Sequence, residues 1–125
     1  MVSLIDTNII IRFLFFFYEE QFKIAKDIFF EIEKSQKMVI ILDVVFMEAF
    51  FVLTKLYQLP KSEVLNDLKS ILALDGVVNS DKVILNEVFN LIENKNIDFV
   101  DALLCAKSKL QGFEKISFDK DLKKC

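Results

Sequence analysis

A small set of acidic residues interrupts otherwise apolar stretches of this sequence. A carboxylate removed from water costs several kcal/mol unless it is paired or binds a cation. The chain has no histidine and a single arginine, so it offers few partners that could neutralise buried acids. Hard divalent ions such as Mg²⁺ and Mn²⁺ prefer oxygen ligands, and one such ion would neutralise several carboxylates together. The acids are Asp6, Glu48, Asp101 and Asp119.

The absence of histidine excludes several kinds of chemistry. Ser/His and Cys/His catalysis, histidine general bases and histidine metal sites are all removed. The formal net charge of −3 makes the chain a poor generic binder of nucleic acid. If it acts on nucleic acid, bound cations or a local lysine patch must offset the repulsion.

The elements that position the acids are predicted from hydrophobic periodicity. Glycine and proline most often interrupt helices and strands, and the chain has only two glycines and one proline. Most of the chain is therefore expected to be helical. Short apolar runs predict strands at residues 2–5, 38–42, 77–78 and 115–117, and longer periodic stretches predict helices at 19–34, 43–57, 62–74, 80–93 and 98–110. Pro60 is expected near the first residue of the helix at 62–74, and Gly112 is expected to end the last helix. This alternation predicts an α/β fold, a three-layer α/β/α sandwich with a central parallel sheet of four to five short strands.

Length and composition predict one domain over residues 1–125, because domains commonly have about 100–150 residues. A hydrophobic content of 54% excludes disorder. No secretory leader is apparent and no apolar run reaches the roughly 20 residues that a bilayer requires, so we expect a cytoplasmic protein without a membrane segment. Two cysteines do not make a disulfide framework; Cys105 is expected as a buried apolar residue and Cys125 as a thiol without a visible partner.

Two of the acids fall where a predicted strand ends and the next element begins. Ligands of open α/β sheets bind outside the carboxyl ends of the strands, which is where Asp6 and Asp119 are expected. Helix capping by aspartate is the alternative for both. Asp43 and Asp98 are interpreted as caps, and Asp98 is also a second candidate for the site.

The other two acids are expected inside helices, where capping does not explain them. Glu48 is predicted about one turn into its helix, and Asp101 about one turn after an N-cap at Asp98. The alternative is an exposed helix face, against which the apolar neighbours argue.

Taken in order, these motifs resemble the PIN-domain family, and within it the small VapC-type toxins of bacterial and archaeal toxin–antitoxin pairs. The resemblance covers essentially the whole chain. It rests on Leu4-Ile5-Asp6-Thr7-Asn8 with Arg12, on the helical Glu48, on Asp98-Phe99-Val100-Asp101-Ala102-Leu103-Leu104, and on Ser117-Phe118-Asp119-Lys120-Asp121-Leu122.

The resemblance implies a Mg²⁺- or Mn²⁺-dependent endoribonuclease whose partner antitoxin blocks the site, and a homodimer is expected. Asp6 and Asp101 would hold the ion, with Asp119 and Glu48 completing its ligands and the ion activating a water. The supporting residues carried over are Thr7 and Ser117, whose hydroxyls would orient ligands or waters, Asn8 for the turn, and Arg12 for a backbone phosphate or a surface salt bridge.

One stretch departs from the family pattern, and rival functions also stay open. Residues 13–18, Phe-Leu-Phe-Phe-Phe-Tyr, are expected to form either an aromatic core, a groove for a partner or a homodimer contact.

Phosphoryl-transfer proteins of the haloacid-dehalogenase type fit poorly, because Asn8 occupies the position where they need an acid. Receiver domains fit poorly as well, because Asp6 lacks the acidic neighbour that they carry. A non-catalytic protein-binding module of the same fold, whose acids only cap helices, is the alternative function.

Overall fold

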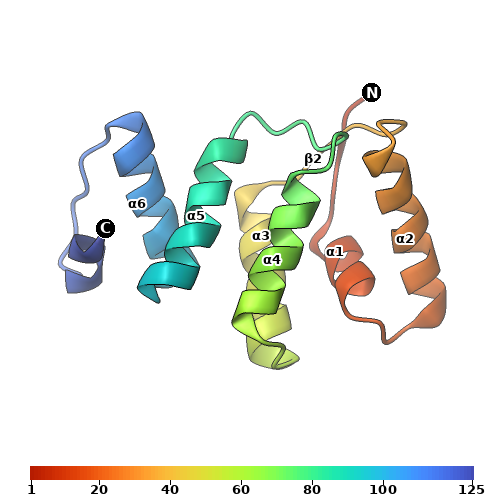
Figure 1. Ribbon diagram of the computed structural model, residues 1–125, viewed down its shortest axis with the longest axis horizontal. Helices are drawn as coiled ribbons and strands as arrows, with labels where there is room; N and C mark the ends of the chain where they lie inside the picture. The colour runs from red at the N-terminus through yellow and green to blue at the C-terminus, as the bar shows by residue number, and fades with distance from the viewer. The chain divides into compact units, whose positions relative to one another are not determined.

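The computed structural model describes residues 1–125, except for the side chains of Asp121 and Lys124. The chain forms two compact units, Met1–Ser80 and Asp81–Cys125. The first contains β1 (Ser3–Leu4), α1 (Thr7–Leu14), α2 (Glu19–Glu33), β2 (Val39–Ile40), α3 (Asp43–Phe51), the π-helical turn η1 (Val52–Leu56) and α4 (Lys61–Leu72). The second contains α5 (Lys82–Lys95), α6 (Phe99–Gln111) and the 3₁₀ helix η2 (Lys120–Lys124) (Figure 1).

The sheet of the first unit is centred on β2. β1 pairs with β2 in parallel, with Ser3 opposite Val39. On the other side of β2, Val77 forms a single parallel bridge to Val39. The Val39 amide donates to the Gly76 carbonyl at 2.8 Å, and the Val78 amide donates to the Val39 carbonyl at 2.9 Å. A third short segment therefore borders β2 without forming a strand of its own.

A buried asparagine extends this border by one more residue. The Asn79 side chain accepts a hydrogen bond from the Ile41 amide at 2.9 Å and donates one to the Ile41 carbonyl at 2.7 Å. The side-chain amide thus pairs with both backbone groups of Ile41 as a neighbouring strand would, which satisfies polar groups that would otherwise be buried without partners.

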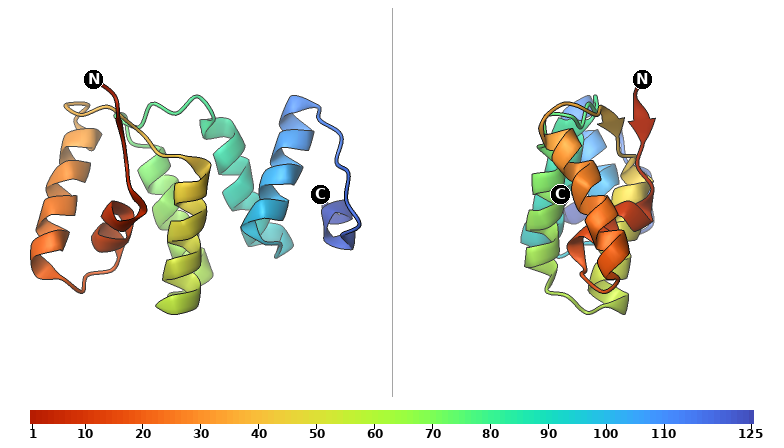
Figure 2. Two further views of the ribbon diagram at one scale, coloured as in Figure 1. Left: turned by 180° about the vertical axis from the view of Figure 1, so that it is seen from behind. Right: turned by 90° about the vertical axis from the view of Figure 1, so that its right-hand side faces the viewer.

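Helices α1, α3 and α4 form the core of the first unit. α1 contacts α2 and α3, and α3 contacts α4, which runs beside it (Figure 2). The apolar positions of α4 recur at intervals of three and four residues, so one face of the helix is buried. The buried residues of α4 are Val64, Leu65, Leu68, Ile71 and Leu72.

The second unit is a helical hairpin followed by a returning segment. α5 ends at Asn96, whose φ of 53° is left-handed, and α6 turns back along it. Gly112, at φ 75°, ends α6 and its amide donates to the Ser108 carbonyl at 3.0 Å. This confirms the predicted helix end at Gly112, where glycine takes the left-handed conformation without steric cost.

The predicted sheet of four to five strands is not confirmed. The described residues form two strands, and the expected strand at 77–78 is reduced to the single bridge at Val77. Residues 115–117 are irregular, and the neighbouring side chains of Ile116 and Phe118 are fully exposed. A strand needs a hydrogen-bonding neighbour, and the part of the second unit that the structure describes contains no other strand that could supply one.

Three helix boundaries also differ from the sequence predictions. The helix expected over 43–57 changes to π-helical hydrogen bonding at Val52, where the Thr54 hydroxyl donates to the Phe50 carbonyl at 2.7 Å. Such back-bonding competes with the regular helical ladder. Asp43 is the first residue of α3 rather than its cap, and Pro60 is the N-cap of α4 rather than its first residue.

The expectation that Cys125 lacks a partner is wrong. A disulfide joins Cys105 to Cys125 with their Cα atoms 5.8 Å apart. Cys105 is buried, as expected. The pairing was not predictable from local pattern, because it depends on the segment after Gly112 returning to α6.

None of the described helices is long and apolar enough to cross a membrane.

Gly76→Ala is expected to lower the free energy of unfolding by about 3 kcal/mol or more, as steric conflicts in a packed interior do. A Cβ at position 76 would lie 2.4 Å from the carbonyl oxygens of Ile32 and Lys37, and both are backbone atoms. Denaturant titration followed by circular dichroism measures the loss.

The matched control is Gly112→Ala. A Cβ there meets no described atom within 4 Å, so only the left-handed backbone conformation opposes the change, at about 1 kcal/mol. Equal losses for the two variants would show that the contacts of Gly76 do not require glycine.

Candidate active site

Asp6 lies directly beyond the carboxyl end of β1, at the N-cap position of α1. Its side chain makes no capping hydrogen bond to the described backbone and is exposed. The carboxylate is therefore at the N-terminus of a helix, where the helix dipole favours negative charge. Of its neighbours, Thr7 is buried with 5% of its surface exposed, and Asn8 is exposed.

Glu48 lies in α3, the helix that follows β2. The buried side of this helix and its continuation contains Phe46, Ala49 and Leu53, which share one face by their spacing. Glu48 lies off this face and is exposed. The expectation that its apolar neighbours would withdraw it from water is therefore wrong, because helical periodicity separates residues that are adjacent in the sequence.

Asp6 and Glu48 both follow strands of one parallel pair. Parallel strands end at the same edge of a sheet, so α1 and α3 begin on the same side of the β1–β2 pair. These two helices contact each other. The first unit therefore presents two exposed carboxylates on the helices that leave this edge.

Asp98 and Asp101 lie at the start of α6. The Asp98 carboxylate accepts a hydrogen bond from the Asp101 amide at 2.8 Å, which confirms the predicted N-cap. Asp101 is the third residue of the helix and is half-buried. The helix N-terminus favours the charge of both carboxylates.

Asp119 lies just before η2, in the segment that returns after α6. Its backbone amide donates to the Ser117 hydroxyl at 2.8 Å, and both side chains are exposed. Such hydroxyl-to-amide bonds stabilise turns. The Ser117 hydroxyl thus fixes the backbone that carries Asp119.

The candidate acids are divided between the two units. Asp6 and Glu48 belong to the first, and Asp98, Asp101 and Asp119 to the second. Among the described side chains, no group of three or more acids or cysteines forms a ready metal site. The donors are all carboxylates, and an all-oxygen set of this kind suits Mg²⁺ or Mn²⁺.

Arg12 is engaged within the first unit. Its Nε donates a hydrogen bond to the Gln21 side-chain oxygen, and its guanidinium carbon lies 4.7 Å from the centre of the Tyr18 ring. A guanidinium at this distance is attracted by the π face of the ring. These two contacts direct Arg12 toward the start of α2.

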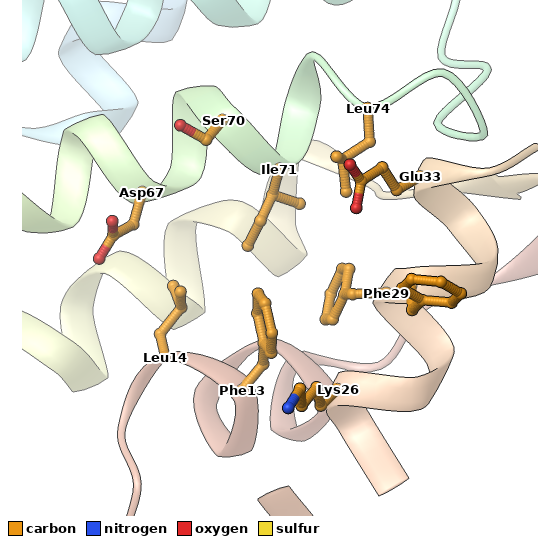
Figure 3. A pocket seen from close by; sticks show the side chains of 10 residues that line it. Phe13, Leu14, Lys26, Phe29, Glu33, Asp67, Ser70, Ile71 and Leu74 are labelled. Atoms are coloured by element: carbon orange, nitrogen blue, oxygen red, sulfur yellow. The ribbon is translucent and has the colours of Figure 1, made fainter. Parts of the chain in front are cut away.

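A cavity of about 350 Å³ lies among α1, α2 and α4 and was not predicted as such (Figure 3). The Phe13 and Phe29 rings, which both line it, stack on each other with their centres 4.6 Å apart. The aromatic residues 13–18 were the sequence signal, but that signal could not identify the contribution of α4. The lining residues are Phe13, Leu14, Lys26, Phe29, Phe30, Glu33, Asp67, Ser70, Ile71 and Leu74.

The aromatic stretch itself is not one helix. α1 ends at Leu14, and Phe15 already has an extended backbone. Phe15 stacks on Tyr57 with ring centres 4.3 Å apart. Phe16 and Phe17 are exposed by 63% and 69%, so the interpretation of residues 13–18 as an aromatic core does not hold for the whole stretch.

Asp67, on the α4 side of the cavity, is half-buried. Burial, and secondarily the negative charge of Glu63, raise the pKa of Asp67 above its ordinary value of 3.8. Both causes disfavour the ionised carboxylate.

Asp67→Asn is expected to stabilise the protein at neutral pH and to give no gain below pH 3.8. Because the folded state raises the pKa of Asp67, the favourable contribution of the protonated carboxyl is complete below pH 3.8 and is lost as the pH rises through the folded-state pKa. Unfolding free energies of both proteins between pH 3 and pH 7 measure this difference.

Glu63→Gln should bring the pKa of Asp67 closer to 3.8, because it removes the neighbouring negative charge. NMR titration of the Asp67 carboxyl measures this pKa, and an unchanged pKa would contradict the effect of the Glu63 charge.

Comparison with known proteins gives one family match. The family model described as PIN domain matches residues 3–125. No curated protein matches the chain.

Proposed function

We propose that this chain, which belongs to the PIN domain family, is a metal-dependent endoribonuclease, because members of that family are usually nucleases. The observation that carries the proposal is the family match over residues 3–125, a range that spans the positions of all four acids. Within the family we propose the role of a VapC-type toxin, acting in the cytoplasm.

The proposed site consists of Asp6, Glu48, Asp101 and Asp119. Because a chain of 125 residues has the length of a single domain, we propose that residues 1–125 function as one PIN domain. The exposure of Asp6, Glu48 and Asp119 supports this set of ligands, since a cation can reach exposed carboxylate oxygens. Asp98 supports Asp101 by capping the helix on which it lies.

Thr7, Asn8 and Ser117 are proposed to support the acids. Thr7 and Asn8 begin α1 directly after Asp6, and the Ser117 hydroxyl accepts a hydrogen bond from the Asp119 amide. We propose that these residues fix the backbone on which two of the ligands lie. They would thereby reduce the conformational entropy that the ligands lose when a metal binds.

The proposed reaction is hydrolysis of an RNA phosphodiester. When bound, Mg²⁺ or Mn²⁺ lowers the pKa of a water and stabilises charge on the phosphate oxygens. One of the four carboxylates accepts the proton of the attacking water. The water oxygen bonds to phosphorus as the bond from phosphorus to the 3′ oxygen breaks. The 3′ oxygen takes a proton from solvent, which leaves a 5′-phosphate and a 3′-hydroxyl.

RNA binding must overcome the net charge of −3. Lys120 and Lys123 are exposed beside Asp119 in the sequence, and we propose that they contact phosphates. Lys124, a further candidate from the sequence, has a side chain outside the described residues. Arg12 would have to leave Gln21 and Tyr18 to bind a phosphate, so its contacts favour a structural role.

A cognate antitoxin is the proposed protein partner, and a homodimer the proposed resting form. The apolar cavity among α1, α2 and α4 supports a partner that inserts apolar side chains. Lys26, Glu33 and Asp67 border it and would select among partners by charge.

Purified protein is expected to cleave RNA with Mg²⁺ or Mn²⁺ and to stop when EDTA is added. The double variant Asp6→Asn/Asp101→Asn should lose at least about 100-fold in rate, because it removes charged groups on which the transition state depends. Product ends are read by mass spectrometry, with 5′-phosphate expected.

Asp27→Asn is the matched control. It removes one carboxylate from the exposed face of α2 and should leave the rate unchanged. If the double variant cleaves as fast as wild type, a contaminating ribonuclease or another site is responsible, and the non-catalytic binding module becomes the better explanation.

A further inference from the structure

We propose that Cys105 and Cys125 form a redox-controlled tether that fixes the segment carrying Asp119 onto α6. Its effect on catalysis rests on the proposed nuclease function, whereas the tether itself does not. Cys105 lies in the middle of α6, and the disulfide to Cys125 closes a stretch of chain with a sequence separation of 20. Figure 1 shows η2 lying beside α6 at the end of this stretch.

Asp101 and Asp119, the two proposed ligands of the second unit, each lie a few residues from one of the two cysteines. Cys105 follows Asp101 by four residues, so the two side chains lie on the same side of α6, one turn apart. Asp119 and Ser117 lie inside the stretch that the disulfide closes. The bond therefore limits how far Asp119 can move from the helix that carries Asp101.

The described large apolar side chains of this segment are mostly exposed, since Phe113 is also exposed by 61%. Leu122 is buried, with 5% of its surface exposed, and Lys115 Nζ donates to the Leu122 carbonyl at 2.8 Å. Ile116 and Phe118 are fully exposed and add no packing. A segment with so little buried apolar surface opens readily, so breaking the covalent bond would release it.

The two sulfur atoms have different surroundings. Cys125 is exposed, and its sulfur lies 3.4 Å from Lys115 Nζ, whereas Cys105 is buried. A neighbouring ammonium group favours a thiolate, the form that attacks disulfides. Cys125 is therefore the residue that meets an external disulfide first, and Cys105 is the resolving partner.

The proposed oxidant is a small-molecule disulfide such as glutathione disulfide. The Cys125 thiolate attacks one sulfur of glutathione disulfide, which forms a mixed disulfide and releases one glutathione thiolate. The Cys105 thiolate then attacks the Cys125 sulfur, which forms the protein disulfide and releases the second glutathione. Two protein thiols are oxidised, one glutathione disulfide is reduced to two glutathione molecules, and excess glutathione reverses the sequence.

The oxidised form is expected to bind the metal more tightly and to cleave faster. With the tether closed, Asp119 is already held near α6, so less conformational entropy is lost when it becomes a ligand. With the tether open, the ordering must accompany binding. We expect a Mn²⁺ affinity and a cleavage rate at least severalfold higher in the oxidised protein.

Hydrogen exchange tests the tether independently of catalysis. The full chain is equilibrated with glutathione disulfide or with excess glutathione, and intact mass identifies the internal disulfide. Amides of residues 112–124 should exchange at least tenfold more slowly in the oxidised protein, while Cys125→Ser should exchange rapidly in both conditions. A glutathione adduct without the internal disulfide, or equal exchange in both states, would overturn the proposal.

Two further measurements separate this proposal from the nuclease function. Lys115→Gln should slow formation of the disulfide severalfold, whereas Lys107→Gln, which removes an exposed charge of α6, should not; equal rates would overturn the role of Lys115. If exchange responds to oxidation but neither state cleaves RNA, the tether stands and the nuclease function fails. If both states cleave equally, the nuclease function stands and the regulation is overturned.

Discussion

Hydrogen bonding on both sides of β2 organises the first unit and the elements that carry its acids. β1 pairs with one edge of β2, and the segment from Gly76 to Asn79 borders the other edge. This double pairing places β2 between two neighbours that are distant in the sequence. Because β1 and β2 are parallel, α1 and α3 leave from the same edge, and Asp6 and Glu48 follow from that arrangement.

The helices were predictable because their signals are local. The three- and four-residue spacing of apolar residues predicted a helix over 19–34, and the structure gives Glu19–Glu33. Asp98 and Gly112 predicted the two ends of α6 for physical reasons that act within a few residues, capping and the left-handed conformation. Such signals do not require knowledge of the remaining chain.

The features that failed prediction depend on partners far along the chain. Residues 115–117 have the composition of a strand, but a strand also requires a neighbour. The disulfide between Cys105 and Cys125 and the cavity among α1, α2 and α4 likewise join segments that no local pattern connects. The spacing of Phe46, Ala49 and Leu53 places them on one helix face and Glu48 off that face, so the sequence did indicate that Glu48 is exposed. The prediction missed this because it considered only the apolar residues adjacent to Glu48 in the sequence.

The order of the acids was readable from the sequence, whereas the exposure of Glu48 was not predicted. Carboxylates repel one another, so a cation that binds several of them would have to offset this repulsion. Each compact unit supplies part of the proposed ligand set, with Asp98 and Ser117 fixing the backbone in the second. The central proposal is that Asp6, Glu48, Asp101 and Asp119 bind one metal ion.

Mn²⁺ affinity measured by electron paramagnetic resonance tests that claim most directly, using Asp6→Asn, Asp101→Asn and the double variant. A shared site predicts that each single change weakens binding at least about tenfold and that the double variant loses less than the sum of the two free-energy losses, because the ligands act on one ion. The claim would be contradicted if Asp6→Asn and Asp101→Asn weakened Mn²⁺ binding at two different sites. It would also be contradicted if either single variant left the Mn²⁺ affinity unchanged.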